Sequence, residues 1–481
     1  MTSAHGKAQP TTIACHPRRD DQAGTSKTMA KTCLVCGKKA GSAEHIFPAA
    51  LGGRRTNRGI YCTLHNNGYG PLAEELTCQL EVFNAQLGVV QDHSKRVRPA
   101  AFTEVSTGHR IDVTDQTAVF GGPDTIAPGE HTLAFSSLEQ ARDWAARQAR
   151  KGMKVEFIGQ GVTDTYLPGV LHAQITLGGP AGLRAIGYIG QTFLAHAFAD
   201  IARQPSLKPF IDHTYQGGDD PLVWWDHDPP PQILTSHFPF GHRIVVGVDA
   251  AQGVAYGRVS LFSSLHFAMI FGPAVGLADQ IRIFDIDPLA LKAPVDLQET
   301  VPAQAWPAPT RPLDMASEMT REITSGRALE RITGLFARIQ DRERELAAAA
   351  LHAQITQLGE IAAHERRERL FDLVWGERQR VLGMLRRVAD ELSESEVAVG
   401  LLRLGLDPAT LVASDPAASD GLTEGARGAL LRASVALSEQ MAADMAGEGL
   451  TAARLKHWIS SGEAHAVVLK AALAPMLEIL A

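Results

Sequence analysis

The segment CLVCGKKAGSAEHIFPAALGGRRTNRGIYCTLHNNGYG, residues 33–70, decides how the N-terminal part of this chain folds. Cys33 and Cys36 are separated by two residues, and Cys62 and His65 repeat that spacing further along the segment. Side chains at this spacing can chelate one tetrahedral ion, and three thiolates with one imidazole are ligands that zinc accepts. The segment therefore predicts a structural zinc site made of two knuckles.

The expected zinc site would carry much of the stability of this small region. A module of about 60 residues buries only a thin core, whereas a structural zinc ion contributes on the order of 10 kcal/mol of apparent folding free energy. The alternative is that these cysteines are small core residues without an ion. Cys78 lies in the apolar-periodic segment that follows, residues 71–88, and we expect it to pack within a helix there.

The residues between and after the knuckles are more than a structural zinc site requires. In chain order the informative ones are Glu44, His45, Gly52, Gly53, Asn57 and Asn66. This arrangement resembles the HNH endonuclease family, the ββα-metal nucleases. In that family an acidic residue and a histidine on a first strand precede a glycine turn, an asparagine and the second knuckle. The resemblance covers residues 33–70 and implies a ββα-metal fold for the module.

The resemblance assigns a role to each polar residue of this set. His45 would act as general base, since an unperturbed imidazole titrates near ~6.5 and can take a proton from water. Glu44 and Asn66 would hold a divalent cation, Mg2+ or Mn2+, which neutralises charge on the scissile phosphate and on the leaving oxygen. Asn57 would orient His45 through its carbonyl oxygen. The segment thus predicts zinc for shape and a second, catalytic metal ion for chemistry.

Two departures from the family pattern leave a rival assignment open. The acidic residue is Glu44 rather than the commoner aspartate, so the side chain that would reach the metal is one methylene group longer. The fourth zinc position is His65 rather than cysteine. In the rival assignment His65 binds the catalytic ion, and zinc is under-ligated or absent. The remaining alternatives are that His45 is an ordinary core or solvent histidine and that Asn66 is a helix cap.

Charge adds a second indication. The net charge of −7 argues against a wholly basic nucleic-acid coat protein. Locally the balance is reversed, because six basic residues stand between residues 31 and 70 against one acidic residue. Arg54, Arg55 and Arg58 belong to the loop between the two expected strands, where we expect them to contact a DNA backbone. The alternative is that these arginines are simply solvated.

Composition and periodicity divide the chain into five regions. These are a disordered leader (1–30), the HNH nuclease zinc module (31–90), an α+β recognition or sensor domain with an antiparallel sheet (100–293), a Pro-rich linker (294–312) and an all-helical region (313–481). The predicted fold class is therefore α+β and multidomain. The sequence contains neither a signal peptide nor an apolar run of about 18 residues, so we expect a cytoplasmic protein without membrane contact.

Apolar patterns place the regular elements within these regions. Strands are expected at 153–159, 242–249, 253–262, 265–272 and 280–287, and helices at 136–152 and 182–203. Two apolar stripes predict helices in the C-terminal region, one from Ile332 to Leu346 and one from Leu370 to Val388.

Together these features predict a metal-dependent endonuclease that hydrolyses phosphodiester bonds in DNA. The middle domain would recognise DNA or a trigger molecule, and the C-terminal helices would form a homodimer or bind a partner protein. The large appended regions suggest regulation, as in restriction or anti-phage defence systems. The competing hypothesis is a non-catalytic zinc module that binds nucleic acid or a protein partner, although such a module has no use for Glu44, His45 and Asn57 together. A third hypothesis is a helical scaffold with a vestigial nuclease module.

Overall fold

A computed structural model describes the chain from residue 31 to residue 480, with gaps. The residues outside the description are 1–30, 106–107, 124–125, 128, 130, 132, 134, 158–170, 219–221, 228, 231–235, 292–296, 300–306, 313, 315–319, 322–323, 359–362, 404–407, 412–420, 447–449 and 481. The expected leader, residues 1–30, therefore lies wholly outside the described part of the chain.

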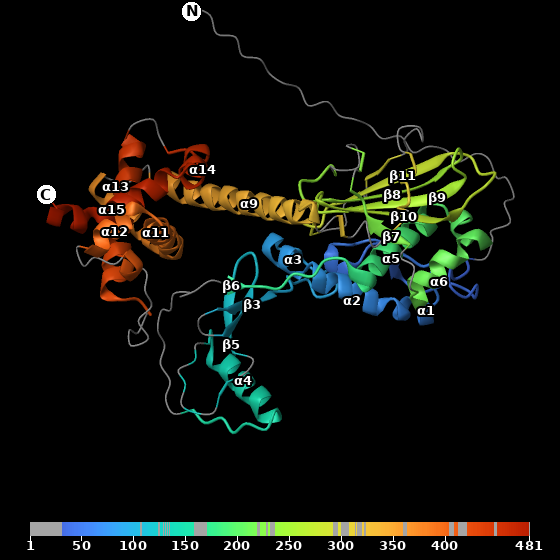
Figure 1. The fold of residues 1–481 in the computed structure, drawn as a ribbon, viewed down its shortest axis with the longest axis horizontal. Coiled ribbons are helices and arrows are strands. Elements are labelled where there is room, and N and C mark those ends of the chain that lie inside the picture. Colours follow the sequence, from blue (N-terminus) through green and yellow to red (C-terminus); the bar gives the residue numbers. More distant parts are fainter. Residues whose placement is uncertain are drawn as a thin grey trace, which may run out of the picture.

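A six-stranded antiparallel sheet is the largest sheet in the described part of the chain, and it lies at the opposite end of the molecule from the C-terminal helices (Figure 1). Its order is β12-β11-β8-β9-β10-β7. The strands are β7 (Val223–Trp225), β8 (His242–Asp249), β9 (Val254–Leu261), β10 (Leu265–Pro273), β11 (Gln280–Ile286) and β12 (Leu297–Glu299). The antiparallel sheet predicted for the middle of the chain is thus confirmed, because short turns join apolar runs that pair with their neighbours in sequence.

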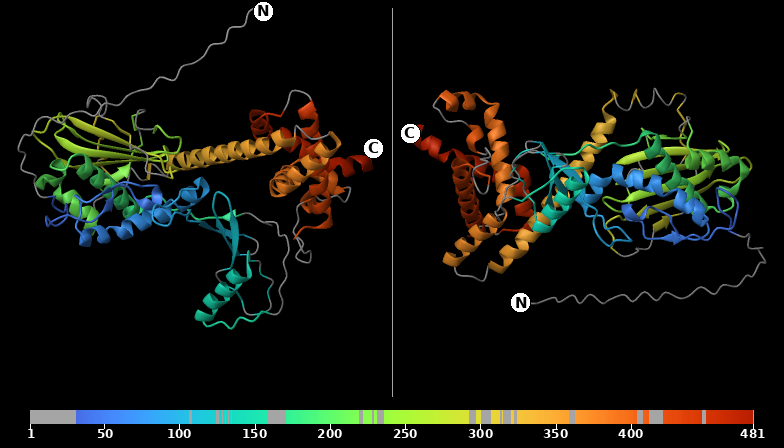
Figure 2. Two further views of the ribbon diagram at one scale, coloured as in Figure 1. Left: turned by 180° about the vertical axis from the view of Figure 1, so that it is seen from behind. Right: turned by 90° about the horizontal axis from the view of Figure 1, so that it is seen from below.

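Helices cover one face of this sheet (Figure 2). The central one is α5 (Gly179–Ala197), the buried helix that the sequence predicts, and α6 (Lys208–Gln216) lies beside it. Glycines let α5 approach the strands closely, since a Cβ at Gly190 would overlap Met269 of β10. This close packing seals the apolar face of the sheet.

The Cys/His segment is part of the same core as the sheet. Phe47 stacks against His242 at the start of β8, with 4.8 Å between ring centroids. The hydroxyl of Tyr61 hydrogen-bonds that of Thr192 on α5 at 2.9 Å. One continuous cluster of buried side chains runs from Cys33 through α5 and the sheet into helix α9. The regions 31–90 and 100–293, which the sequence suggests are separate domains, therefore share a hydrophobic core.

The expected helix at 71–88 forms as two consecutive helices, α2 (Gly70–Gln79) and α3 (Glu81–Leu87). The break falls at Leu80, and Gly88 ends the second helix in a left-handed conformation. Cys78 does not pack inside as expected, because its side chain is exposed on α2.

A smaller four-stranded sheet, β5-β4-β3-β6, stands apart from the six-stranded one (Figure 1). Its strands are β3 (Ala100–Glu104), β4 (His109–Val113), β5 (Ala118–Pro123) and β6 (Leu171–His172). Helix α4 (Leu138–Arg150) lies between β5 and β6 in the sequence and begins after the serine cap Ser137, as predicted. The strand expected at 153–159 is wrong over residues 153–157, which are described and have no regular structure.

The C-terminal region is helical, as predicted. Its helices are α9 (Arg327–Leu358), α10 (Ala363–Gly376), α11 (Arg378–Ser393), α12 (Glu396–Arg403), α13 (Glu424–Ala446), α14 (Ala452–Ser461) and α15 (Glu463–Leu480). They enclose a second core that includes Leu370 and Val388. Leu346, expected in the first apolar stripe, is 54% exposed instead. Figure 1 shows α9 reaching from the sheet to this helical bundle.

The expected Pro-rich linker, 294–312, contributes to the sheet where it is described. Leu297–Glu299 form edge strand β12 against β11. Ala308 is buried against the sheet, and its backbone N–H donates to Asp249 Oδ2 at 3.1 Å. Over the described residues, no helix is both long and apolar enough to cross a membrane.

Candidate functional site

Two short strands and a helix position the candidate site. Strand β1 (Glu44–His45) pairs antiparallel with β2 (Thr56–Asn57), so that Glu44 faces Asn57 in the register. The connection turns at Gly52, whose φ of 91° suits glycine. At Gly53 a Cβ would overlap the carbonyl of Phe47, so both glycines of the pair are required by the turn. Helix α1 (Thr63–Gly68) begins directly after Cys62.

The four predicted zinc ligands come together. The ligand atoms of Cys33, Cys36, Cys62 and His65 all lie within 4.8 Å of one another. His65 Nδ1 is 3.2 Å from Cys62 Sγ and 3.6 Å from Cys33 Sγ, and the sulfurs of Cys36 and Cys62 are 3.9 Å apart. This group could bind zinc.

The spacing within the group fits a tetrahedral ion. Zinc bonds of about 2.3 Å to sulfur and about 2.0 Å to nitrogen imply S···S edges of about 3.8 Å and S···N edges of about 3.5 Å. Burial opposes ionisation of the Cys62 thiol, but hydrogen bonds from the backbone and ring of His65 outweigh it and lower the thiol pKa to about 6. Because His65 Nδ1 points at two sulfurs, the geometry favours His65 as the fourth ligand over the rival assignment to a catalytic ion.

Glu44 is a buried acid without a counter-charge. Only 6% of the residue is exposed, and burial raises the pKa of its carboxyl to about 8. Within the described part of the chain, no hydrogen bond or ion pair reaches this carboxyl. A carboxyl in such surroundings is costly unless it stays protonated or a cation joins it.

Asn66 presents a second unsatisfied oxygen. Its backbone N–H donates to the carbonyl of Cys62 at 2.9 Å, which fixes the first turn of α1. Its side-chain Oδ1 is buried and has no hydrogen-bond partner among the residues described. Such an orphan costs about 1–3 kcal/mol and in a native protein calls for an ion or a water. Carboxylate and amide oxygens are the ligand types that Mg2+ and Mn2+ prefer.

His45 is held by a residue that the sequence did not single out. Its Nε2 lies 3.2 Å from Asp92 Oδ2, and the ring of His93 packs edge-on against it at 4.8 Å between centroids. The His45 side chain is 16% exposed, which leaves it accessible. Asp92 follows α3 in sequence and lies far from the motif, so no local spacing marks it.

Asn57 makes contacts other than the expected one. Its Oδ1 accepts the backbone N–H of Gly59 at 2.8 Å, and its amide nitrogen lies 3.0 Å from Nδ1 of His196, the last-turn histidine of α5. Burial lowers the pKa of His196, with nearby Arg55 adding to the effect. The carbonyl oxygen of Asn57 is therefore used by the turn rather than by His45. His196 is the other residue at the site that sequence reasoning missed.

The three loop arginines differ in their surroundings. Arg54 has a side chain only 5% exposed, and it donates to the carbonyls of Val90 and Ala290 at 2.6 and 3.2 Å. The expectation that Arg54 contacts DNA is therefore at odds with its internal role, since its donors hold chain segments together. Arg55 and Arg58 are both exposed, but Arg58 follows β2 directly and does not lie in the loop between the strands as expected.

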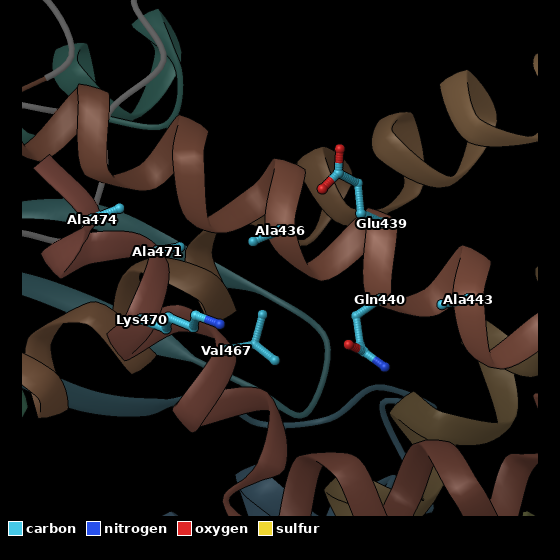
Figure 3. Close-up of a pocket in the computed structure, with 8 residues that line it drawn as sticks. All are labelled: Ala436, Glu439, Gln440, Ala443, Val467, Lys470, Ala471 and Ala474. Atoms are coloured by element: carbon cyan, nitrogen blue, oxygen red, sulfur yellow. The ribbon is translucent and has the colours of Figure 1, made fainter. Parts of the chain in front are cut away.

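A hollow elsewhere in the molecule is not part of this site. It lies between α13 and α15, has a volume of about 430 Å³ and is lined mainly by alanines with Glu439, Gln440 and Lys470 (Figure 3). Its lining offers no thiol or imidazole, so it lacks the ligand types gathered in the N-terminal segment.

Comparison with models of protein families, with curated proteins and with solved structures returns no match to this chain.

Proposed function

We propose that this protein is a metal-dependent endonuclease that hydrolyses phosphodiester bonds in DNA. Two observations carry the proposal: Glu44 is a buried residue whose carboxyl has no hydrogen-bond partner among the described residues, and the Oδ1 of Asn66 is buried and unpaired there as well. They occupy the two positions that the HNH resemblance assigns to the catalytic metal. His45, the residue assigned as base, is adjacent in sequence to the first of them and partly exposed.

The reaction follows from the residues present. His45 takes a proton from water, the water oxygen attacks phosphorus, and the bond from phosphorus to the 3′ oxygen breaks. A divalent cation, when bound, supplies positive charge for the phosphate and the leaving oxygen. Glu44 and Asn66 would hold that cation, and a single carboxylate would leave it with net positive charge. The Cys3His group would fix β1, β2 and α1 relative to one another through zinc.

Exposed arginines support a DNA partner. Arg55 ends the loop between β1 and β2, Arg58 follows β2 directly, and β2 pairs with the strand that carries the candidate base. Guanidinium groups contact phosphates without regard to sequence, and each contact strengthens binding in a salt-dependent way. Arg54 is excluded from this role in the proposal because its side chain is engaged internally.

The competing function is a zinc module that binds nucleic acid or a protein partner without catalysis. The zinc group alone would serve that function equally well. It gives no account of a buried glutamate beside an accessible histidine, because an uncompensated buried carboxyl destabilises a module that needs no second ion.

The proposal is tested by plasmid cleavage with the full chain in Mg2+, Mn2+ or EDTA. We expect nicking or linearisation with either metal, none with EDTA, and a loss of at least about 100-fold in His45→Ala. His457→Ala is the matched control. His457 is an exposed histidine on α14 that also pairs with an acid, Glu463, and α14 is remote in sequence from the candidate site.

Equal cleavage by His45→Ala and wild type would reject His45 as the base. Zinc-loaded, folded wild type that binds DNA in a gel shift but does not cut it with either metal would favour the non-catalytic zinc module instead.

A further inference from the structure

The contact between His45 and Asp92 has consequences for the proposed reaction. Asp92 Oδ2 lies 3.2 Å from His45 Nε2, and the two side chains are 25% and 16% exposed. The backbone N–H of Asp92 donates to the carbonyl of Ala49 at 3.3 Å, in the turn that follows β1. Asp92 therefore contacts the turn after β1 through its main chain and the candidate base on β1 through its side chain.

Asp92 is kept ionised by its neighbours. Lys95 Nζ lies 2.7 Å from Oδ1, and Arg54 Nη1 lies 3.6 Å from the same oxygen. The hydrogen bond from Lys95 is the largest influence, with that from His45 next among those that favour charge, and together they lower the Asp92 pKa to about 2. The buried Arg54 is itself anchored to two backbone carbonyls, so the carboxylate is held in place.

We propose that Asp92 is the positioning residue of the nuclease site, in the role that the sequence pattern assigns to Asn57. This inference rests on the proposed function, because it concerns the same base. Asp92 does not touch substrate in this account; it acts through His45 alone.

The chemistry of the pair fixes which nitrogen of His45 is basic. A carboxylate has no proton to give, so it can only accept, and Nε2 must therefore carry the hydrogen of the neutral imidazole. Nδ1 is left with its lone pair and becomes the atom that takes the proton from water. The carboxylate also stabilises the imidazolium that forms after proton transfer, as an aspartate does for histidine in hydrolytic triads.

Asn57 is engaged in a different way. Its oxygen accepts from Gly59 and its amide group contacts His196, so its polar atoms are both in use within the described structure. An amide at position 92 would also be a poor substitute for the carboxylate. Lys95 and Arg54 both lie on the Oδ1 side of Asp92, so an asparagine would keep its carbonyl oxygen on that side and turn its NH2 group toward His45. The NH2 group would donate to Nε2, which places the hydrogen on Nδ1 and removes the lone pair that accepts the proton.

The kinetic test uses the full chain on plasmid or duplex DNA with Mn2+. Asp92→Asn is expected to lower kcat about 100-fold with KM changed by less than about 3-fold, since only a step after binding is affected. Asp92→Glu restores the carboxylate and should recover at least about tenfold of that loss. Asp212→Asn is the matched control, because Asp212 also pairs with a lysine, Lys208, on the distant helix α6. Equal kcat in Asp92→Asn and wild type would overturn the inference.

A second measurement needs neither substrate nor activity. In protein labelled with 15N-histidine, the His45 signals are identified by their loss in His45→Ala. We expect hydrogen on Nε2 in wild type and on Nδ1 in Asp92→Asn, with zinc content unchanged. Hydrogen on Nδ1 in wild type would contradict the inference directly. If wild type fails to cleave DNA, the proposed function fails, and the tautomer still decides whether Asp92 orients His45.

Discussion

The N-terminal segment contains two groups of candidate metal ligands, and they differ in how they are built. The zinc group has four ligands from two local knuckles, all within 4.8 Å. The Glu44 group has an acid and a base on β1 and an amide on α1, and in our proposal it depends on Asp92 beyond the motif. All ligands of the first group come from one short segment, whereas the second group needs a residue from outside that segment. A zinc site that stabilises the fold can therefore be formed locally, while the proposed catalytic site requires tertiary contacts.

The largest expected effect is the loss of the zinc group. Cys62→Ser removes a thiolate at its centre, and structural zinc contributes on the order of 10 kcal/mol of apparent binding free energy. We expect the variant to lose zinc, measured by mass spectrometry of the metal content, and to unfold around residues 31–90 in hydrogen exchange. Cys78→Ser is the control, because Cys78 lies outside the ligand group. Full zinc content in Cys62→Ser would show that the group is not a zinc site.

The next effect tests the buried core of the six-stranded sheet, against which the N-terminal segment packs. Burial lowers the pKa of His242 and of His266 to about 3, from an ordinary value near 6.5. As pH falls below 6.5 the unfolded chain binds protons at these histidines first, so stability present above pH 6.5 is lost toward pH 3. At pH 5 the two together should cost about 4 kcal/mol of unfolding free energy.

Urea unfolding at pH 7.5 and pH 5, with zinc in excess, measures this loss. Glu44, whose pKa burial raises to about 8, acts in the opposite direction and is common to both proteins. Between the two pH values His242→Gln should therefore lose about 2 kcal/mol less stability than wild type. If the change in unfolding free energy between the two pH values were the same in His242→Gln and wild type, His242 would not be held neutral in the folded protein. The core shared by the two groups would then not have the burial described above.

A smaller effect separates the second metal from the first. At one hundred times its Kd a ligand of the folded state adds about 3 kcal/mol of stability. Mn2+ should therefore raise the melting temperature of zinc-loaded wild type, and Glu44→Gln should abolish this rise while keeping its zinc. Asp212→Asn should retain the rise. An equal rise in the melting temperature of Glu44→Gln would show that Mn2+ binds elsewhere, and Glu44 would then not be a metal ligand.

The smallest effect compares two neighbouring arginines. Arg54→Gln should cost about 2 kcal/mol of unfolding free energy, because it leaves buried carbonyls without donors, whereas Arg58→Gln should leave stability unchanged. In gel shifts across a salt series, Arg58→Gln should reduce the slope of log K against log salt by about 1. The reverse pattern would restore the DNA-contact role to Arg54.

The parts of this structure that sequence could predict are those set by local patterns. The zinc ligands, the strands from β8 to β11 and helix α5 follow from spacing and apolar periodicity. The missed features depend on tertiary contacts. Asp92 and His196 reach the site through packing, and the edge strand β12 forms in a proline-rich stretch because β11 offers it an unpaired edge. Buried Arg54 likewise looked like its exposed neighbours, since only the fold supplies its carbonyl partners.

Helix α9 gives the molecule a property that neither of its ends has alone. Leu335 and Ile339 are packed in the first core, and Ile355 and Leu358 in the second, so one uninterrupted helix of 32 residues is shared by both. Each residue added to such a helix turns everything beyond it by about 100° and lengthens it by about 1.5 Å. The length of an insertion in α9 therefore matters. One added residue would rotate the helical bundle by about 100° about the α9 axis. Seven would move the bundle outward by about 10 Å and leave its orientation nearly unchanged. The rotation about the α9 axis, more than the length of α9, therefore determines which surfaces of the sheet region and of the helical bundle face the same side.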